Sequence, residues 1–291
     1  MRAAFSFWSL PFRGALAGRA RFADWADQRH GLLAWALAAR RARRFVGPTE
    51  LITDSYGAKL FADLGIAFDD VRVELDVLER EDPRIWVQGK LLAYISAAKR
   101  GPFLHLDNDV WLTRRLPRAV LDAQLVAQSI EPINHPNYAG TYAPTIEALR
   151  RWPMPPSWLH DLHSPVQHAF NMGLVGGQRV DVLDRAAREG FNVLANANWE
   201  RAGLHPNNVS CVAEQYTFGA TARAMGVPVA TLLRGPANEP AADVDAQRLG
   251  YSHAMGMAKR DPVVISRLLA RAQAECPEAT ARIFALFPAP L

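Results

Sequence analysis

The sequence predicts an α/β fold built on a mixed, mostly parallel sheet with helices on its faces. Along the first half of the chain, short apolar runs of strand length alternate with longer segments whose apolar residues recur at helical spacing. Such alternation favours a parallel sheet, because each parallel strand must be reached through a crossover that is usually a helix. The 291 residues show no fixed-period repeat and no low-complexity tract, so we expect one domain over residues 1–291.

The first strand is expected within residues 3–10. This apolar stretch superficially resembles a signal peptide, but Arg2 is its only leading charge and Pro11 interrupts it, so a strand and its following loop suit it better. Residues 25–44 carry apolar side chains at helical spacing and should form the first long helix. Strand and helix therefore alternate from the start.

Capping residues place the next elements. After a short strand at residues 50–53, Asp54 is a suitable N-cap for a helix that should stop at Gly65. Residues 71–75 alternate between apolar and polar side chains and predict another short strand. The Asp-Pro pair that opens residues 82–98 predicts a helix there.

The second half of the chain is less regular. Two stretches should lack helices and strands, namely the aromatic and proline-rich residues up to about 167 and the Pro/Ala-rich residues 234–248. Aromatic side chains in the first stretch suit either stacking on sugar rings or packing against the core. Further elements are expected as strands at 125–129, 169–177 and 227–232, and as helices at 179–189, 213–225 and from 261 onward.

Composition and charge narrow the class of protein. No apolar run approaches the roughly 20 residues that span a bilayer, although peripheral contact with a membrane stays open. The net charge of +4 is spread out, and the arginines at 40–44 lack the interleaved aromatics of a nucleic-acid surface, so we expect no nucleic-acid partner. Cys211 and Cys276 have no paired spacing, which favours a reducing, cytoplasmic location.

Two acids follow the apolar run at residues 103–106. In an extended chain alternate side chains share a face, so Asp107 and Asp109 can point the same way at the end of this strand. Parallel α/β sheets bind their ligands beyond the carboxyl ends of the strands. A pair of carboxylates at that place suits a hard divalent cation, an aspartyl nucleophile with a neighbouring acid, or simply a solvated turn.

Four short motifs follow one another along the chain. They are Leu-Asp-x-Asp-Val with Asp107 and Asp109, Phe-Asn-x-Gly with Asn171 and Gly173, the pair Glu214 and Gln215, and His-x-x-Gly-x-x-Lys with His253, Gly256 and Lys259. Together they give a chain that resembles the GT-A glycosyltransferases, whose fold is Rossmann-like. The resemblance is to the retaining family-8 group of glycogenin and the bacterial lipopolysaccharide galactosyltransferases, and to a divergent bacterial branch of it.

The resemblance implies a transferase that moves a sugar, with retention, from a nucleotide-diphosphate donor such as a UDP-sugar to a saccharide or glycolipid acceptor. It implies Mn²⁺, or Mg²⁺, as the cofactor. The roles it implies are metal binding for Asp107, Asp109 and His253, sugar-donor binding for Lys90, Asn171, Gly173, Gly256 and Lys259, and catalysis for Glu214 and Gln215. The domain would comprise a nucleotide-binding half at residues 1–112, an acceptor side with site closure at 113–260, and C-terminal helices at 261–291.

Two other functions fit parts of the pattern. Asp107 and Asp109 also match the nucleophile motif of haloacid-dehalogenase-type phosphatases, although that motif normally lies on the first strand. A non-catalytic nucleotide-sugar-binding protein would keep the pocket and lack the reaction. If transfer inverted the anomeric centre, a carboxylate base would be needed near the acceptor hydroxyl, and Asp161 is the candidate for it.

Overall fold

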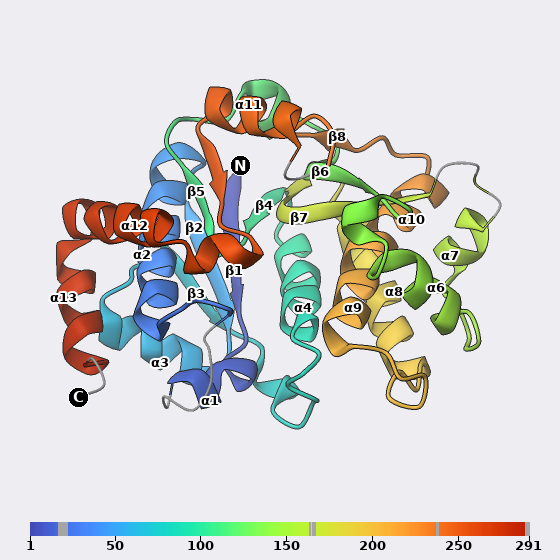
Figure 1. Cartoon of the computed structure of the whole chain (residues 1–291), viewed down its shortest axis with the longest axis horizontal. Helices are drawn as coiled ribbons and strands as arrows, with labels where there is room; N and C mark the ends of the chain where they lie inside the picture. Colours follow the sequence, from blue (N-terminus) through green and yellow to red (C-terminus); the bar gives the residue numbers. More distant parts are fainter. Residues whose placement is uncertain (17–22, 163, 165–166, 237–238, 289–291) are drawn as a thin grey trace.

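The computed structural model describes residues 1–16, 23–162, 164, 167–236 and 239–288. These residues contain a seven-stranded sheet with the strand order β3-β2-β1-β4-β7-β6-β8 (Figure 1). Its strands are β1 (Arg2–Phe7), β2 (Thr49–Thr53), β3 (Asp70–Val73), β4 (Phe103–Leu106), β6 (Val126–Pro132), β7 (His168–Gly177) and β8 (Ala230–Thr231). Only the pairings of β7 with β4 and β6 are antiparallel within this sheet, so the predicted mixed, mostly parallel sheet is confirmed.

Helices cover both faces of this sheet. One face packs against α2 and α3, with α12 and α13 on the outer side of these two helices, and the other face packs against α4, α8 and α10 (Figure 1). The helices are α1 (Arg13–Leu16), α2 (Gln28–Phe45), α3 (Ser55–Leu64), α4 (Val87–Ala98), α5 (Arg118–Leu121), α6 (Tyr142–Leu149), α7 (Pro156–Asp161), α8 (Val180–Asn196), α9 (Pro206–Cys211), α10 (Thr217–Ala224), α11 (Pro240–Leu249), α12 (Pro262–Glu275) and α13 (Pro277–Leu286). Within the described ranges, no helix is both long enough and apolar enough to cross a membrane.

Several predicted helix ends are confirmed by their caps. The Asp54 carboxylate accepts a hydrogen bond from the Gly57 amide at 2.7 Å, and Gly65 ends α3 with a left-handed φ of 68°. The Asp261 carboxylate accepts from the Val263 amide at 2.7 Å and opens α12. Each of these caps depends only on residues that are close together along the chain, so it can be predicted from the sequence alone.

The predicted helix start at Asp82 is wrong. The Asp82 carboxylate accepts from the backbone amide of Arg84 at 2.9 Å and from its guanidinium at 3.0 Å, which closes a local turn. The helix α4 then begins at Val87, after Trp86. An Asp-Pro pair can open a turn as readily as a helix, and here the turn is formed.

Two stretches predicted to lack regular structure contain helices. Residues up to 167 include α6 and α7, whose Tyr142 and Trp158 are buried, so these two aromatics pack in the core. Residues 234–248 include most of α11, which has proline in its first turn and ends at Gly250 with a φ of 64°. The predicted strand at 227–232 shrinks to the two residues of β8. Of the expected C-terminal helical segment, residues 289–291 lie outside the described residues.

Candidate metal centre and adjoining pocket

The chain turns sharply where β4 ends. The Asp107 backbone amide donates to the Gly173 carbonyl at 2.9 Å, and the Val110 amide donates back to the Asp107 carbonyl at 3.1 Å. The strand β5 (Val110–Leu112) then leaves the main sheet and pairs antiparallel with β9 (Tyr251–His253), with Val110 opposite His253. This pairing brings His253 close to Asp107 and Asp109.

The side chains of Asp107, Asp109 and His253 form a cluster. One ligand atom from each lies within 4.8 Å of the others, so together they could hold a metal ion. Asp109 is buried, and its Oδ1 accepts no hydrogen bond from the described residues although His253 Nε2 lies 3.2 Å away. Two carboxylates and an imidazole form a mixed oxygen and nitrogen set, which suits Mn²⁺ or another divalent transition metal and also admits Mg²⁺. The residues present therefore fit a divalent cation.

Two lysines face the same acids. Lys90 on α4 places its Nζ 2.8 Å from Asp107 Oδ1 and 2.8 Å from Glu214 Oε1. Lys259 places its Nζ 2.8 Å from Asp109 Oδ2. Burial by itself lowers the pKa of Lys90, but the carboxylates of Asp107 and Glu214 outweigh it and raise that pKa. The Asp109 carboxylate likewise outweighs burial and raises the pKa of Lys259, so both lysines are held as cations beside the cluster.

The same balance acts on Asp109. Burial tends to raise the pKa of this carboxyl, but the charges beside it, the Lys259 ammonium first, outweigh burial and hold the pKa well below its usual value. Asp109 is therefore a carboxylate at neutral pH. A buried carboxylate is costly unless it is paired, and here an ammonium group is its partner.

Gly173 is where the backbone of β7 approaches the cluster. A Cβ at this position would lie 2.5 Å from Gln128 Oε1 and 2.5 Å from the Nδ1 of His253. The Gly173 amide donates to Asn171 Oδ1 at 3.0 Å, and Asn171 Nδ2 donates to Glu131 Oε1 at 3.0 Å. The expected close approach at this glycine is therefore made by the histidine ring, and Asn171 supports the strand from the side.

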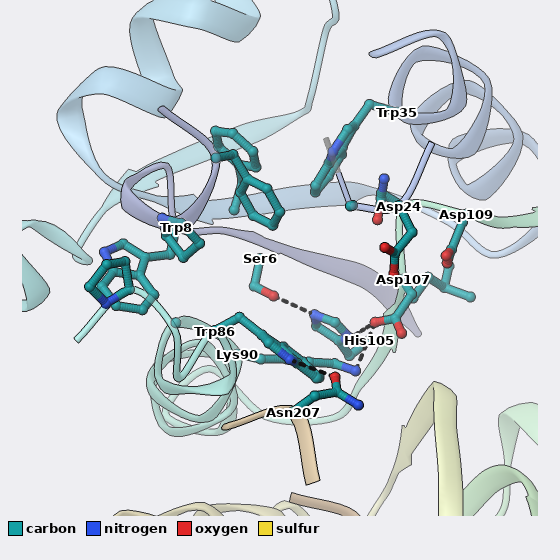
Figure 2. Close-up of a pocket in the computed structure, with 18 of the residues that line it drawn as sticks. Ser6, Trp8, Asp24, Trp35, Trp86, Lys90, His105, Asp107, Asp109 and Asn207 are labelled. Atoms are coloured by element: carbon teal, nitrogen blue, oxygen red, sulfur yellow. Dashed lines mark hydrogen bonds and ion pairs between the residues drawn. The ribbon is translucent and has the colours of Figure 1, made fainter. Parts of the chain in front are cut away.

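A pocket of about 450 Å³ opens beside the acids at the carboxyl ends of β1 and β4 (Figure 2). Trp8, Trp35 and Trp86 line it together with Lys90, Asp107, Asp109 and Lys259. Ser6 Oγ and His105 Nε2 lie 2.9 Å apart on its floor, and Trp86 Nε1 donates to Asn207 Oδ1 at 3.2 Å at its rim. The pocket thus combines aromatic walls with two cationic side chains and three acidic ones, of which Asp24 is the third.

The structure places the other predicted residues farther from the pocket. Glu214 is buried behind Lys90 and also accepts from the Tyr94 hydroxyl at 2.6 Å. Gln215 Oε1 accepts from the Tyr142 hydroxyl. Neither Glu214 nor Gln215 lines the pocket. Gly256 is exposed and begins the short 3-10 helix Gly256–Arg260 with a left-handed φ of 49°, which suits glycine. The predicted catalytic roles of Glu214 and Gln215 stay predictions.

Asp161, the candidate base for an inverting reaction, is part of the interior. It is fully buried, and its two oxygens accept from Arg223 at 2.5 and 2.8 Å. The Tyr216 hydroxyl donates to the same carboxylate at 2.8 Å. These contacts fix one end of α7 to α10, and Asp161 is not open to an acceptor.

A protein-family model described as a family of unknown function (DUF6734) matches residues 1–286. The chain belongs to this family. No curated protein matches the chain. The description of the DUF6734 family names no activity, so the residues of the site are the basis for a function.

The sequence-based prediction did not include some of the residues that form this site. Ser6 and Trp8 follow from the rule that sites lie at the carboxyl ends of strands, because Ser6 is the penultimate residue of β1 and Trp8 directly follows that strand. Gln128 and Glu131 are polar residues inside a buried strand. Polar side chains in an otherwise apolar run could have marked both as candidate site residues. Asn207 reaches the rim from the start of α9, and nothing in the sequence marks it.

Proposed function

We propose that the protein is a metal-dependent glycosyltransferase that moves a sugar from a nucleotide-diphosphate donor to a hydroxyl of a saccharide or glycolipid acceptor. A UDP-sugar is the expected sugar donor. The observation that carries the proposal is the clustering of Asp107, Asp109 and His253 beside two lysines, because both acids and both lysines line the pocket. A divalent cation bound by the first three residues would stabilise the negative charge of a departing diphosphate.

The lysines suit the same substrate. The ammonium groups of Lys90 and Lys259 line the pocket on the side of the acids, and each can exchange a carboxylate oxygen for a phosphate oxygen. In the structure described here the acids hold them in place. A nucleoside diphosphate would therefore meet two positioned ammonium groups in addition to the metal. Neither α4, which carries Lys90, nor the short helix Gly256–Arg260, which carries Lys259, would need to move far.

The walls of the pocket suit the nucleoside. A volume of about 450 Å³ lies in the range of small-molecule sites, which are mostly apolar with a few placed polar groups. Trp8 and Trp35 are buried in the wall, so the partly exposed Trp86 is the ring on which a base would stack, and stacking does not depend on the identity of the base. Ser6 and His105 are the polar pair on the floor. Burial holds the pKa of His105 well below its usual value, so this ring is neutral and can both donate and accept.

Retention of configuration is part of the proposal and depends on the resemblance. Glu214 and Gln215 lie in a π-helical turn (Val212–Tyr216) between α9 and α10, and such turns are frequent at functional sites. Glu214 fixes Lys90, and Gln215 faces the acceptor-side helix α6 through the Tyr142 hydroxyl. Glu214 would thus act by positioning a lysine, and Gln215 is the residue nearer to an acceptor.

Calorimetric titration of UDP in the presence and absence of Mn²⁺, followed by a product assay with a set of nucleotide-sugars, tests the proposal. We expect Mn²⁺-dependent binding and release of the nucleoside diphosphate on turnover. Hydrolysis of p-nitrophenyl phosphate, with no turnover of any nucleotide-sugar, would replace the proposal with a phosphatase. Tight binding of a nucleotide-sugar that is never consumed would replace it with a binding protein.

A further inference from the structure

We propose that Gln128 is the positioning residue of the metal centre. It holds the His253 ring in the tautomer that carries the proton on Nδ1, and so turns the Nε2 lone pair toward Asp109 and a bound cation. This inference rests on the proposed function, because it takes the cluster of Asp107, Asp109 and His253 to be a metal site. It concerns a residue outside that cluster, on a different strand.

The contacts of Gln128 define the tautomer. Gln128 lies on β6 with 1% of its surface exposed, and its Oε1 is 2.7 Å from His253 Nδ1. The same oxygen accepts from the Tyr251 hydroxyl at 2.6 Å. An amide oxygen can only accept, so the proton of the neutral imidazole must be on Nδ1 and the lone pair on Nε2. The second nitrogen of a metal-binding histidine usually makes such a bond.

The opposite side of the ring shows what this tautomer requires. Nε2 lies 3.2 Å from Asp109 Oδ1, and that oxygen accepts no hydrogen bond from any residue in the described part of the chain. For the neutral ring, a lone pair that faces a carboxylate oxygen is unfavourable, and the nearby Lys259 ammonium contacts the other oxygen of Asp109, Oδ2, at 2.8 Å. A divalent cation that takes Nε2 and Oδ1 as ligands removes this conflict and satisfies the buried oxygen.

The surroundings of the ring leave little room for another orientation. Any side chain on Gly173 would collide with Gln128 Oε1 and with the edge of the His253 ring, since its Cβ would lie 2.5 Å from each. The pairing of Val110 with His253 fixes the backbone from the other side. Gln128, Gly173 and β5 therefore enclose the imidazole.

A rotated Gln128 amide gives the competing arrangement. Its NH₂ group would then donate to His253 Nδ1, which would have to carry the lone pair. Nε2 would carry the proton and donate to Asp109, and the three residues would form an ordinary hydrogen-bonded chain with no need of a cation. Replacing Gln128 by glutamate distinguishes the two arrangements, because glutamate keeps the accepting oxygen and removes the NH₂ group.

The experiment is a titration of the full-length protein with Mn²⁺ alone, followed by calorimetry and by the electron paramagnetic resonance signal of free Mn²⁺. We expect Gln128→Leu and Gln128→Met to weaken Mn²⁺ binding about 10-fold or more, the usual effect of losing such a partner. Gln128→Glu should bind Mn²⁺ at least as tightly as the unmodified protein. Tyr251→Phe is the matched control, because it removes the other hydrogen bond to Gln128 Oε1 and leaves His253 bound.

The outcomes separate this inference from the proposed function. If the unmodified protein binds Mn²⁺ and both the leucine and methionine variants bind it equally well, the positioning role is wrong and the metal centre stands. If Gln128→Glu loses as much affinity as Gln128→Leu, the amide is rotated and the inference fails in the same way. If the unmodified protein binds no divalent cation, the metal centre itself is wrong. Two replacements of different shape, each checked by thermal unfolding, guard against a variant that fails to fold.

Discussion

At the scale of single residues, Asp109 is the acid on which metal binding should depend most. Its Oδ1 is buried without a hydrogen bond from the described residues, and Oδ2 is paired with Lys259. Asp109→Asn keeps the shape and removes the charge, so we expect Mn²⁺-dependent binding of UDP to weaken by about 10–100-fold or more while the fold stays intact. Calorimetry measures the affinity, and Asp63→Asn, which alters an exposed ion pair with Lys59, is the control. Unchanged affinity would end the metal assignment.

Lys259 should behave differently with and without metal. Without a cation it is the ammonium partner of the buried Asp109 carboxylate, so Lys259→Met leaves that carboxylate unpaired. Breaking a buried pair from one side costs about 3 kcal/mol, so the variant should unfold at lower urea concentration than the unmodified protein. Saturating Mn²⁺ should restore much of the difference. Equal stability of the two proteins without metal would show that the pair contributes nothing.

At the scale of helices and strands, acid should weaken the contact between β7 and α10. Burial lowers the pKa of His168 to about 4 from 6.5, and the neighbouring Arg223 acts in the same direction. The folded protein thus keeps this ring neutral while the unfolded chain takes up a proton below pH 6.5. The stability that His168 contributes is complete above that pH and is lost as the pH falls from 6.5 to about 4.

His168→Phe tests this pH dependence. The ring packs edge-on against Phe170 at 4.9 Å, so phenylalanine suits the site and does not titrate. The free energy of unfolding should fall less between pH 7 and pH 5 in the variant than in the unmodified protein. Parallel falls in the two proteins would mean that His168 has an ordinary pKa.

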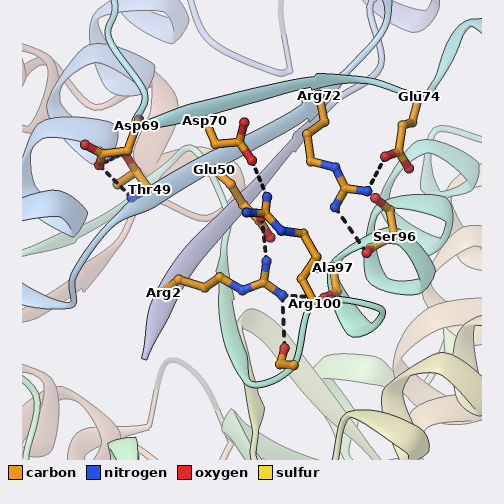
Figure 3. Close-up of polar contacts among 11 residues, drawn as sticks. Arg2, Thr49, Glu50, Asp69, Asp70, Arg72, Glu74, Ser96, Ala97 and Arg100 are labelled. Carbon is orange, nitrogen blue, oxygen red and sulfur yellow. Dashed lines mark hydrogen bonds and ion pairs between the residues drawn. The ribbon is translucent and has the colours of Figure 1, made fainter.

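Local signals in the sequence accounted for much of the fold, and contacts over long separations did not. The caps of α3 and α12 and the acids after β4 were visible because each depends on a few neighbouring residues. The ion pairs of Glu50 could not be seen in the sequence, because their partners are far away along the chain. This buried carboxylate accepts from Arg2 at 2.6 Å and from Arg100 at 3.2 Å (Figure 3). Arg2 and Glu50 lie at the amino ends of β1 and β2, whereas the pocket lies at the carboxyl ends of β1 and β4. Only the finished sheet brings these residues together.

The candidate site divides in the same way. The motifs predicted that Asp107, Asp109, His253 and Lys259 belong together, and the structure brings their side chains into contact. Gln128 escaped notice because a lone polar residue in an apolar strand has several ordinary explanations, and only its distance to His253 distinguishes them. Spacing along a sequence indicates which residues could be metal ligands, whereas the residues that hold those side chains in place depend on packing.

At the scale of the whole molecule, the C-terminal segment from residue 251 onward forms part of the main apolar core as well as part of the site. The helix α12 packs against α2, and Tyr251, Leu268 and Ile283 belong to the same apolar core as β1 (Figure 1). Deleting residues 251–291 should therefore expose this core and yield a chain without a cooperative thermal transition. Circular dichroism during heating measures it. A deleted chain that melts cooperatively would mean that the segment is a separable lid.

The lysine pairs have a consequence for a cell that runs short of metal. The ammonium groups of Lys90 and Lys259 already pair with the two acids that a cation would bind, so neither carboxylate is left without a positive partner in the apoprotein. Proteins whose metal is structural unfold when it is removed. This one should instead survive prolonged chelation by EDTA with its near-ultraviolet dichroism and its cooperative melting intact, and regain nucleotide binding when Mn²⁺ is returned. Collapse of the tertiary signal on chelation would show that the ion supports the fold as well as the chemistry.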